Sequence, residues 1–249
     1  MKKLYISFLL LFINLITFAT NFSVAPTRFE LKLNKSITDE VYIMNNTKKQ
    51  LRIETYLESD KAFGENYNLN SNIVIFPKVV TIKPAGEQII RFRVKPGTNL
   101  KDGEYKSYIV FKEVPLEIKS IGNKNNNSTS SNITIITELG ISIYGITGQE
   151  ILKGYVENFK LTYKDKVLGI KFDSISTGNT SFKYKYIVED EKGKILSQGR
   201  AGNSLRNGKT NIGITLTKTE NFKGKNIKVK ILDQNNNLLK EKNIKINSL

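Results

Sequence analysis

The residues that could perform chemistry in this chain are few and of limited kinds. The 249 residues include no histidine, no cysteine and no tryptophan. Histidine is the side chain best suited to proton transfer near neutral pH, and histidine and cysteine are the usual zinc ligands. The carboxylates are scattered and form no paired motif. Glu189, Asp190 and Glu191 fall in a predicted hairpin turn, where solvated charges are usual. No glycine-rich phosphate-binding pattern is present. We therefore expect a protein that is not an enzyme and that needs neither a cofactor nor a metal.

The positive charge of the chain raises the question of an anionic partner. The formal net charge is +16 at pH 7. Such a charge could indicate nucleic acid, a membrane surface or an anionic glycan. The lysines are spread among Asn and Ile along the chain and form no dense stripe, which is typical of a solvated surface. We expect no nucleic-acid partner.

The N-terminal segment is typical of a secretory signal peptide. Lys2 and Lys3 precede an apolar run that extends from Leu4 to Phe18, which is short for a membrane span. Thr17 and Ala19 are small residues at positions −3 and −1 relative to a signal-peptidase site, which predicts cleavage after Ala19. Residues 1–19 would then be removed; an uncleaved anchor is the alternative. Without cysteine no lipid anchor can form, and we expect no stable membrane anchor.

The rest of the chain shows apolar residues with a period of two and no helical periodicity, which predicts an all-β protein. Asn, Gly and Pro clusters separate the segments. The predicted strands are 22–24, 29–33, 39–45, 50–57, 73–76, 79–82, 88–95, 103–113, 133–144, 158–163, 167–176, 181–190, 194–200, 208–216, 226–233 and 238–246. This spacing predicts two immunoglobulin-like β-sandwich domains, residues 20–145 and 146–249, with a hinge at Gly145 to Gly148.

One predicted strand follows a segment of unusual composition. Residues 120–132 are rich in Asn and Ser and lack apolar residues after Ile121, which predicts a mobile loop. The strand that follows, 133–144, alternates over its whole length. Its apolar face consists of Ile133, Ile135, Thr137, Leu139, Ile141 and Ile143. For Leu139 to Ile143 the ordinary last strand of a sandwich explains the pattern equally well.

Several segments of the first half, in order, resemble the periplasmic chaperones of fimbrial (pilus) subunits. They are Phe22 to Arg28 with Pro26-Thr27-Arg28, Val41 to Thr47, Ile75 to Val79 with Ile82-Lys83-Pro84 and Gln88 to Val94, and Glu104 with Tyr108 to Phe111 and Lys112 to Pro115. The likeness extends over residues 23–144, whereas only two hairpins, at 174–180 and 189–194, resemble the second domain of that family.

The resemblance implies a function and its residues. Members of this family have two sandwich domains at an angle and work in the periplasm, where they bind fimbrial subunits and pass them to an outer-membrane usher. The chaperone lends a β-strand to a subunit that lacks one. In this chain the donor residues would be Ile133, Ile135 and Thr137. Arg28 would bind the C-terminal carboxylate of the client in the cleft between the domains, because a guanidinium can hold both oxygens.

The chain also departs from the family pattern. The family pairs its arginine with a lysine, and Ser142 stands where that lysine belongs, so another cation such as Arg91 would have to complete the site. Gly145 and Ile146 replace the Arg-Pro that usually closes the long strand. For Arg28 itself, a solvated arginine on an edge strand is the alternative interpretation. The alternative function is a structural adhesin or fimbrial subunit, but the number of strands, enough for two complete domains, favours a chaperone.

Overall fold

The structure, a computed structural model, describes residues 20–97, 100–115 and 135–246. The predicted signal peptide, the predicted loop at 120–132 and Ile133 lie outside the described residues. Within them, no helix has the length and apolar character needed to cross a membrane.

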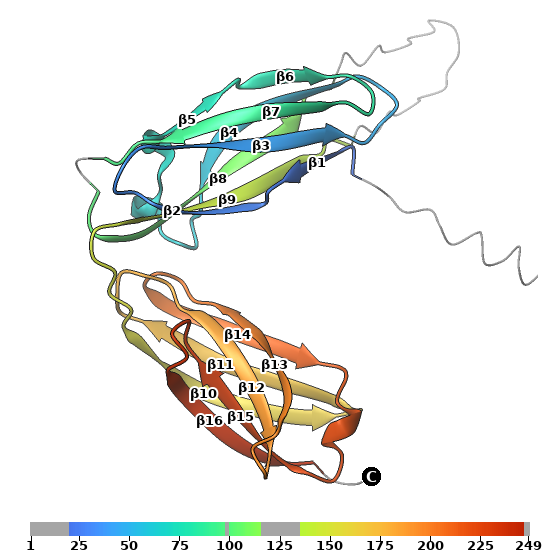
Figure 1. Ribbon diagram of the computed structural model, residues 1–249, viewed down its shortest axis with the longest axis vertical. Helices are drawn as coiled ribbons and strands as arrows, with labels where there is room; N and C mark the ends of the chain where they lie inside the picture. Colours follow the sequence, from blue (N-terminus) through green and yellow to red (C-terminus); the bar gives the residue numbers. More distant parts are fainter. Residues whose placement is uncertain (1–19, 98–99, 116–134, 247–249) are drawn as a thin grey trace, which may run out of the picture.

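Strands make up most of the described chain, with three short 3-10 helices between them (Figure 1). The strands of the first half are β1 (Phe22–Ala25), β2 (Arg28–Lys32), β3 (Ile37–Asn45), β4 (Leu51–Ser59), β5 (Ile73–Phe76), β6 (Val79–Ile82), β7 (Glu87–Val94), β8 (Gly103–Glu113) and β9 (Glu138–Thr147). Those of the second half are β10 (Gly154–Lys164), β11 (Val167–Ser176), β12 (Lys183–Asp190), β13 (Ile195–Asn203), β14 (Gly208–Leu216), β15 (Asn226–Leu232) and β16 (Leu238–Lys245). The 3-10 helices are η1 (Glu65–Tyr67), η2 (Asn70–Asn72) and η3 (Glu220–Phe222).

Each half folds into a two-sheet sandwich with its own core. The first combines the sheets β1-β3-β7-β5 and β2-β9-β8-β4-β6, and the second combines β10-β11-β14 and β13-β12-β15-β16. Alternate residues of each strand point inward, as a period of two requires. Phe92 and Ile143 belong to the first core, and Phe172 and Tyr184 belong to the second. The expected fold, all-β with two sandwich domains at an angle, is confirmed (Figure 1).

The start of the first domain changes sheets. β1 pairs with β3 in one sheet, and after Pro26 and Thr27 the chain enters the other sheet, where β2 runs parallel to β9. Proline has no N–H for a sheet hydrogen bond, so it suits the point where pairing with one partner ends. This crossing brings Arg28, the first residue of β2, beside β9.

The structure corrects two predictions about β9. The predicted strand begins at Ile133, but β9 begins at Glu138, and Ile135 to Thr137 precede it. Gly145 was expected at the hinge, yet it lies inside β9, which continues to Thr147. A Cβ on Gly145 would lie 2.6 Å from Leu33 Cδ1 and 2.8 Å from Leu69 Cδ1. Close packing, and not backbone flexibility, therefore explains this glycine. The division at residue 145 stays a prediction.

Candidate functional site

β9 has one edge that is only partly covered. It pairs with β8 along its whole length, from Gly103↔Thr147 to Lys112↔Glu138. On its other side β2 covers only Ser142 to Ile146. The N–H of Ser142 donates to the carbonyl oxygen of Thr27, and by alternation the N–H groups of Glu138 and Gly140 point to that same side. Among the described residues these two groups have no backbone partner, so β9 offers an open edge from Glu138 to Ile141, which we call the free edge.

The apolar face of β9 passes from solvent into the core. Ile135 is 80% exposed, Leu139 is half-buried against the core, and Ile141 and Ile143 are 1% and 0% exposed. Ile141 and Ile143 are thus ordinary core residues, as one of the two interpretations of the sequence expected. Ile135 and Thr137, two of the three predicted donor residues, lie outside the core at the beginning of the free edge, and the third, Ile133, lies outside the described residues.

Neighbouring strands hold the start of β9 in place. Tyr56 of β4 donates a hydrogen bond of 2.8 Å to Glu138, and Lys112 of β8 forms an ion pair of 3.6 Å with the same carboxylate. The hydrogen bond to Glu138, with smaller contributions from burial and nearby carboxylates, raises the pKa of Tyr56 to about 12. The N–H of Glu113 donates to the carbonyl of Thr137 over 2.9 Å. The free edge is therefore a fixed strand.

Arg28 lies at the end of the free edge. It is in register with Ser142, and its guanidinium lies 4.0 Å from the centre of the Tyr144 ring. Its Nε and Nη2 both contact Oε1 of Glu30 at 2.8 Å. The alternative of a free, solvated arginine does not describe this side chain, which is 29% exposed and engaged on both sides.

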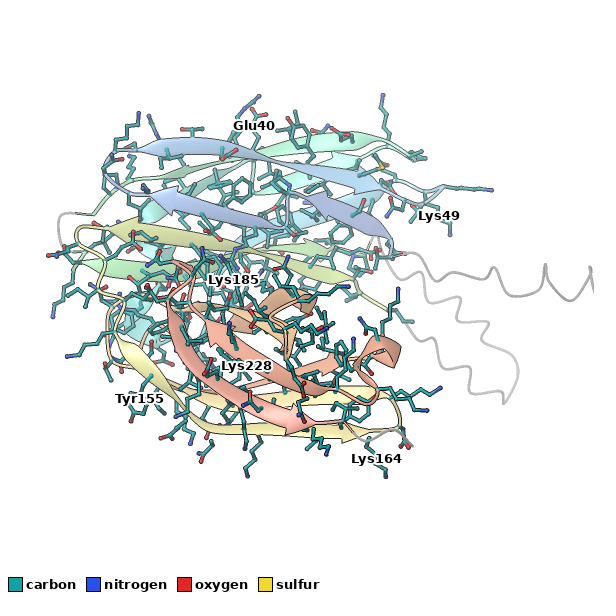
Figure 2. The ribbon with its side chains drawn as sticks, turned by 60° about the horizontal axis from the view of Figure 1, so that its bottom comes forward. Glu40, Lys49, Tyr155, Lys164, Lys185 and Lys228 are labelled. Carbon is teal, nitrogen blue, oxygen red and sulfur yellow. The ribbon has the colours of Figure 1, made fainter. Side chains whose placement is uncertain are left out.

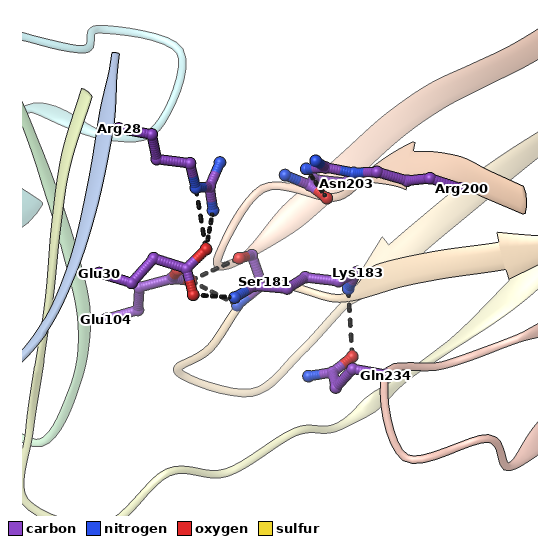
Figure 3. Close-up of polar contacts among 8 residues, drawn as sticks. All are labelled: Arg28, Glu30, Glu104, Ser181, Lys183, Arg200, Asn203 and Gln234. Atoms are coloured by element: carbon purple, nitrogen blue, oxygen red, sulfur yellow. Dashed lines mark hydrogen bonds and ion pairs between the residues drawn. The ribbon is translucent and has the colours of Figure 1, made fainter. Parts of the chain in front are cut away.

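Glu30 connects Arg28 to the second domain. Its second oxygen, Oε2, forms an ion pair with Nζ of Lys183 on β12. Figure 3 shows Arg28 and Glu30 directed from the first domain toward Lys183 in the second. Partial burial raises the pKa of Glu30, but the hydrogen bonds and charges of Lys183 and Arg28 outweigh it, so the pKa lies below its ordinary value. Glu30 is thus an anion placed between two cations.

A groove in the second domain begins at this ion pair. It has a volume of about 600 Å³ and is lined by Glu30 together with residues of β12, β13 and β15. Three cations, Lys183, Lys185 and Arg200, line it against the single carboxylate. Figure 2 shows Lys185 on the side of the second domain that faces the first. The groove therefore favours an anionic group.

The two domains meet in a buried polar joint beside this site. Glu104 of β8 accepts hydrogen bonds from the N–H and the hydroxyl of Ser181. Arg206 donates to the carbonyl oxygens of Glu104 over 2.7 Å and Asp102 over 3.1 Å, and it lies 3.8 Å from the centre of the Tyr67 ring. Glu104 and Arg206 are only 2% and 5% exposed. Buried charges with this many partners hold the domains in one arrangement.

A comparison with models of known protein families identifies the family of the first domain. Residues 21–141 match the family model described as "Pili and flagellar-assembly chaperone, PapD N-terminal domain". The first domain is a divergent member of this pilus-assembly chaperone family. The match includes Arg28 and Glu30 and ends at Ile141, within β9.

Solved structures similar to this chain include several described as chaperones. The YadV chaperone is 13% identical, with a TM-score of 0.47, and the match covers 91% of this chain and 100% of that one. For the E. coli chaperone DraB the values are 10%, 0.46, 90% and 96%. For a chain of the Salmonella enterica complex of the SafA pilin with the SafB chaperone they are 11%, 0.45, 92% and 98%. No curated protein sequence matches this chain.

The structure places one predicted site cation, Arg91, away from Ser142. Arg91 was suggested as a replacement for a lysine at Ser142, but it forms an ion pair of 2.7 Å with Glu40 across β7 and β3. Figure 2 shows Glu40 on the face of the first domain that points away from the second. Arg91 cannot reach the site because its strand belongs to the other sheet.

Sequence reasoning missed two cations near Arg28. Lys106 of β8 lies 5.3 Å from the centre of the Tyr144 ring, but its charge is taken up by Asp60 at 2.5 Å. Its position opposite Tyr144 follows from the alternation of β8 and β9, which could have indicated it. Lys183 lies in the other domain, and the sequence held no signal for its approach.

Proposed function

We propose that this chain is a periplasmic chaperone that binds fimbrial subunits by lending them the free edge of β9. The observation that carries the proposal is the position of that edge directly ahead of Arg28. A client strand on this edge could pair with the unsatisfied N–H groups of Glu138 and Gly140. Ile135 and Thr137, together with Ile133, would fill the gap in the client's core.

The geometry also supports a direction for the client strand. β2 occupies the same edge of β9 from Ser142 onward and runs parallel to β9. A client strand that ran in the same direction would have to end where β2 begins. Its C-terminal carboxylate would then meet Arg28, as the family resemblance implies. We include an outer-membrane usher among the proposed partners on that resemblance alone.

The competing function, a structural adhesin or fimbrial subunit, is less well supported. A subunit that polymerises by strand exchange has a sandwich with one strand missing, which leaves part of its core open. Here both sandwiches bury their own cores with their own strands. The free edge could give a strand to another protein. It does not require a groove in this chain that would receive one.

Co-expression with fimbrial subunits encoded near this gene tests the proposal. We expect a one-to-one complex with at least one subunit, and its loss in the double variant Ile133→Asp/Ile135→Asp. Ile195→Asp is the matched control, because Ile195 is an exposed isoleucine (49%) on β13 of the second domain. Circular dichroism should show both variants folded. The proposal would be rejected if none of the subunits tried gave a complex.

A further inference from the structure

The carboxylate of Glu30 occupies a position that a peptide C-terminus could take. One oxygen receives Nε and Nη2 of Arg28, and the other contacts Lys183. A terminal carboxylate has the same two oxygens and the same charge. Glu30 therefore satisfies both cations in the same way as a bound client terminus could.

Lys183 also supplies the positive charge that is missing at position 142. Ser142 is in register with Arg28 but carries no charge, and Lys106 is already neutralised by Asp60. Lys183 reaches the same carboxylate as Arg28, so it can act as the second cation for one anion. It comes from the second domain, which makes the binding site a shared property of both domains.

We propose that Arg28 and Lys183 together bind the client's C-terminal carboxylate and that Glu30 occupies this site until the client displaces it. The inference rests on the proposed function and assigns two further residues to its site. Displacement leaves the domains joined, because Glu104, Ser181 and Arg206 connect them independently of Glu30. Glu30 and Lys183 are 47% and 36% exposed, so an incoming carboxylate has access to both.

Once displaced, Glu30 needs another cation, and the groove provides some. Lys185 and Arg200 line the same groove as Glu30. Lys185 is held by Asn236 at 2.8 Å and Arg200 by Asn203 at 2.9 Å, and neither has a carboxylate partner among the described residues. The four cations Arg28, Lys183, Lys185 and Arg200 therefore outnumber the carboxylates even when a client carboxylate is added to that of Glu30.

Binding of a synthetic peptide tests this assignment. The probe is the last ten or so residues of a co-purifying subunit, long enough to cover the free edge, prepared with a free C-terminal carboxylate and as the C-terminal amide. Calorimetry on the whole chain compares the wild type with Glu30→Gln, Lys183→Met and the control Lys209→Met. Lys209 is an exposed lysine of the same domain that pairs with Asp173 at 2.7 Å.

We expect Glu30→Gln to bind the free-acid peptide about tenfold more tightly than the wild type, and Lys183→Met to bind it about tenfold more weakly. Either substitution should change the affinity for the amide peptide by less than about twofold. Lys209→Met should match the wild type. Wild-type binding of the peptide with no dependence on residues 30 and 183 would overturn this inference alone. No binding of either peptide form to the wild type, together with no subunit complex, would overturn the proposed function and this inference with it.

Discussion

The carboxylate of Glu104 in the first domain receives both the backbone N–H and the hydroxyl of Ser181 in the second domain. The backbone carbonyl of Glu104 at the same time accepts from Arg206, and its N–H donates to the carbonyl of Asn179 over 2.8 Å. One buried residue thus uses its side chain and both of its backbone groups to connect the two sandwiches. The relative position of Arg28 and Lys183 depends on this joint.

Glu104→Ala should weaken the joint. It leaves the N–H of Ser181 buried without its acceptor, and a hydrogen bond to a charged group contributes about 1.5–3 kcal/mol. We expect a loss of about 2 kcal/mol in the free energy of unfolding by urea and a larger radius of gyration in small-angle X-ray scattering. Glu87→Ala, at an exposed position of β7, is the control. Identical scattering and stability in both variants would contradict this role.

Arg206→Lys should not replace arginine, although it keeps the charge. The guanidinium donates to two carbonyl oxygens and lies 3.8 Å from the centre of the Tyr67 ring, and a lysine ammonium lacks its planar fork. We expect a loss of about 1–3 kcal/mol in unfolding free energy, measured by urea denaturation. Arg52→Lys, on the exposed face of β4, should change it by less than about 0.5 kcal/mol. Equal stability of the two lysine variants would show that only charge matters.

The two ends of the apolar face of β9 should respond differently to truncation. Ile143→Ala leaves a cavity in the first core and should cost about 2–4 kcal/mol of unfolding free energy. Ile135→Ala should change it by less than about 0.5 kcal/mol, because that side chain is in solvent. Urea denaturation of both variants measures the difference. A large loss for Ile135→Ala would mean that the residue is part of the core and cannot be offered to a client.

Asp60 should make the first domain sensitive to acid. Partial burial raises its pKa, but the hydrogen bond and charge of Lys106, together with hydrogen bonds from Tyr108 and the backbone of Phe63, outweigh it, so the pKa lies below its ordinary 3.8. A carboxyl group whose pKa is lowered by folding stabilises the protein above its unfolded-state pKa, and this contribution disappears as the pH falls through the folded-state pKa.

Asp60→Asn removes this titration. We expect the variant to be less stable than the wild type at neutral pH and to lose less of its remaining stability in acid. Thermal melting between about pH 7 and about pH 2 measures both effects. Asp165→Asn is the control, because Asp165 is exposed and asparagine tolerates its positive φ of 51°. Parallel pH profiles for the wild type and Asp60→Asn would contradict the prediction.

The positions of the strands could be predicted from the sequence because they depend on neighbouring residues. The predicted ranges for β5, β6, β8, β11 and β14 coincide with the structure. Alternation records which side of a strand is buried, and turn-forming residues mark its ends. The start of β9 was predicted five residues too early, because the alternation continues from Ile133 although Ile135 to Thr137 are not in a strand.

The sequence by itself therefore determined the all-β class and the two sandwiches, with Arg28 directly before the predicted strand at 29–33. Only the tertiary structure decided that β2 covers half of one edge of β9, that Glu30 lies between Arg28 and Lys183, and that Arg91 points elsewhere. The physical reason is range. Burial within a strand follows a local period, whereas the partner of a charged side chain depends on which sheet its strand joins and on the angle between two separately folded domains.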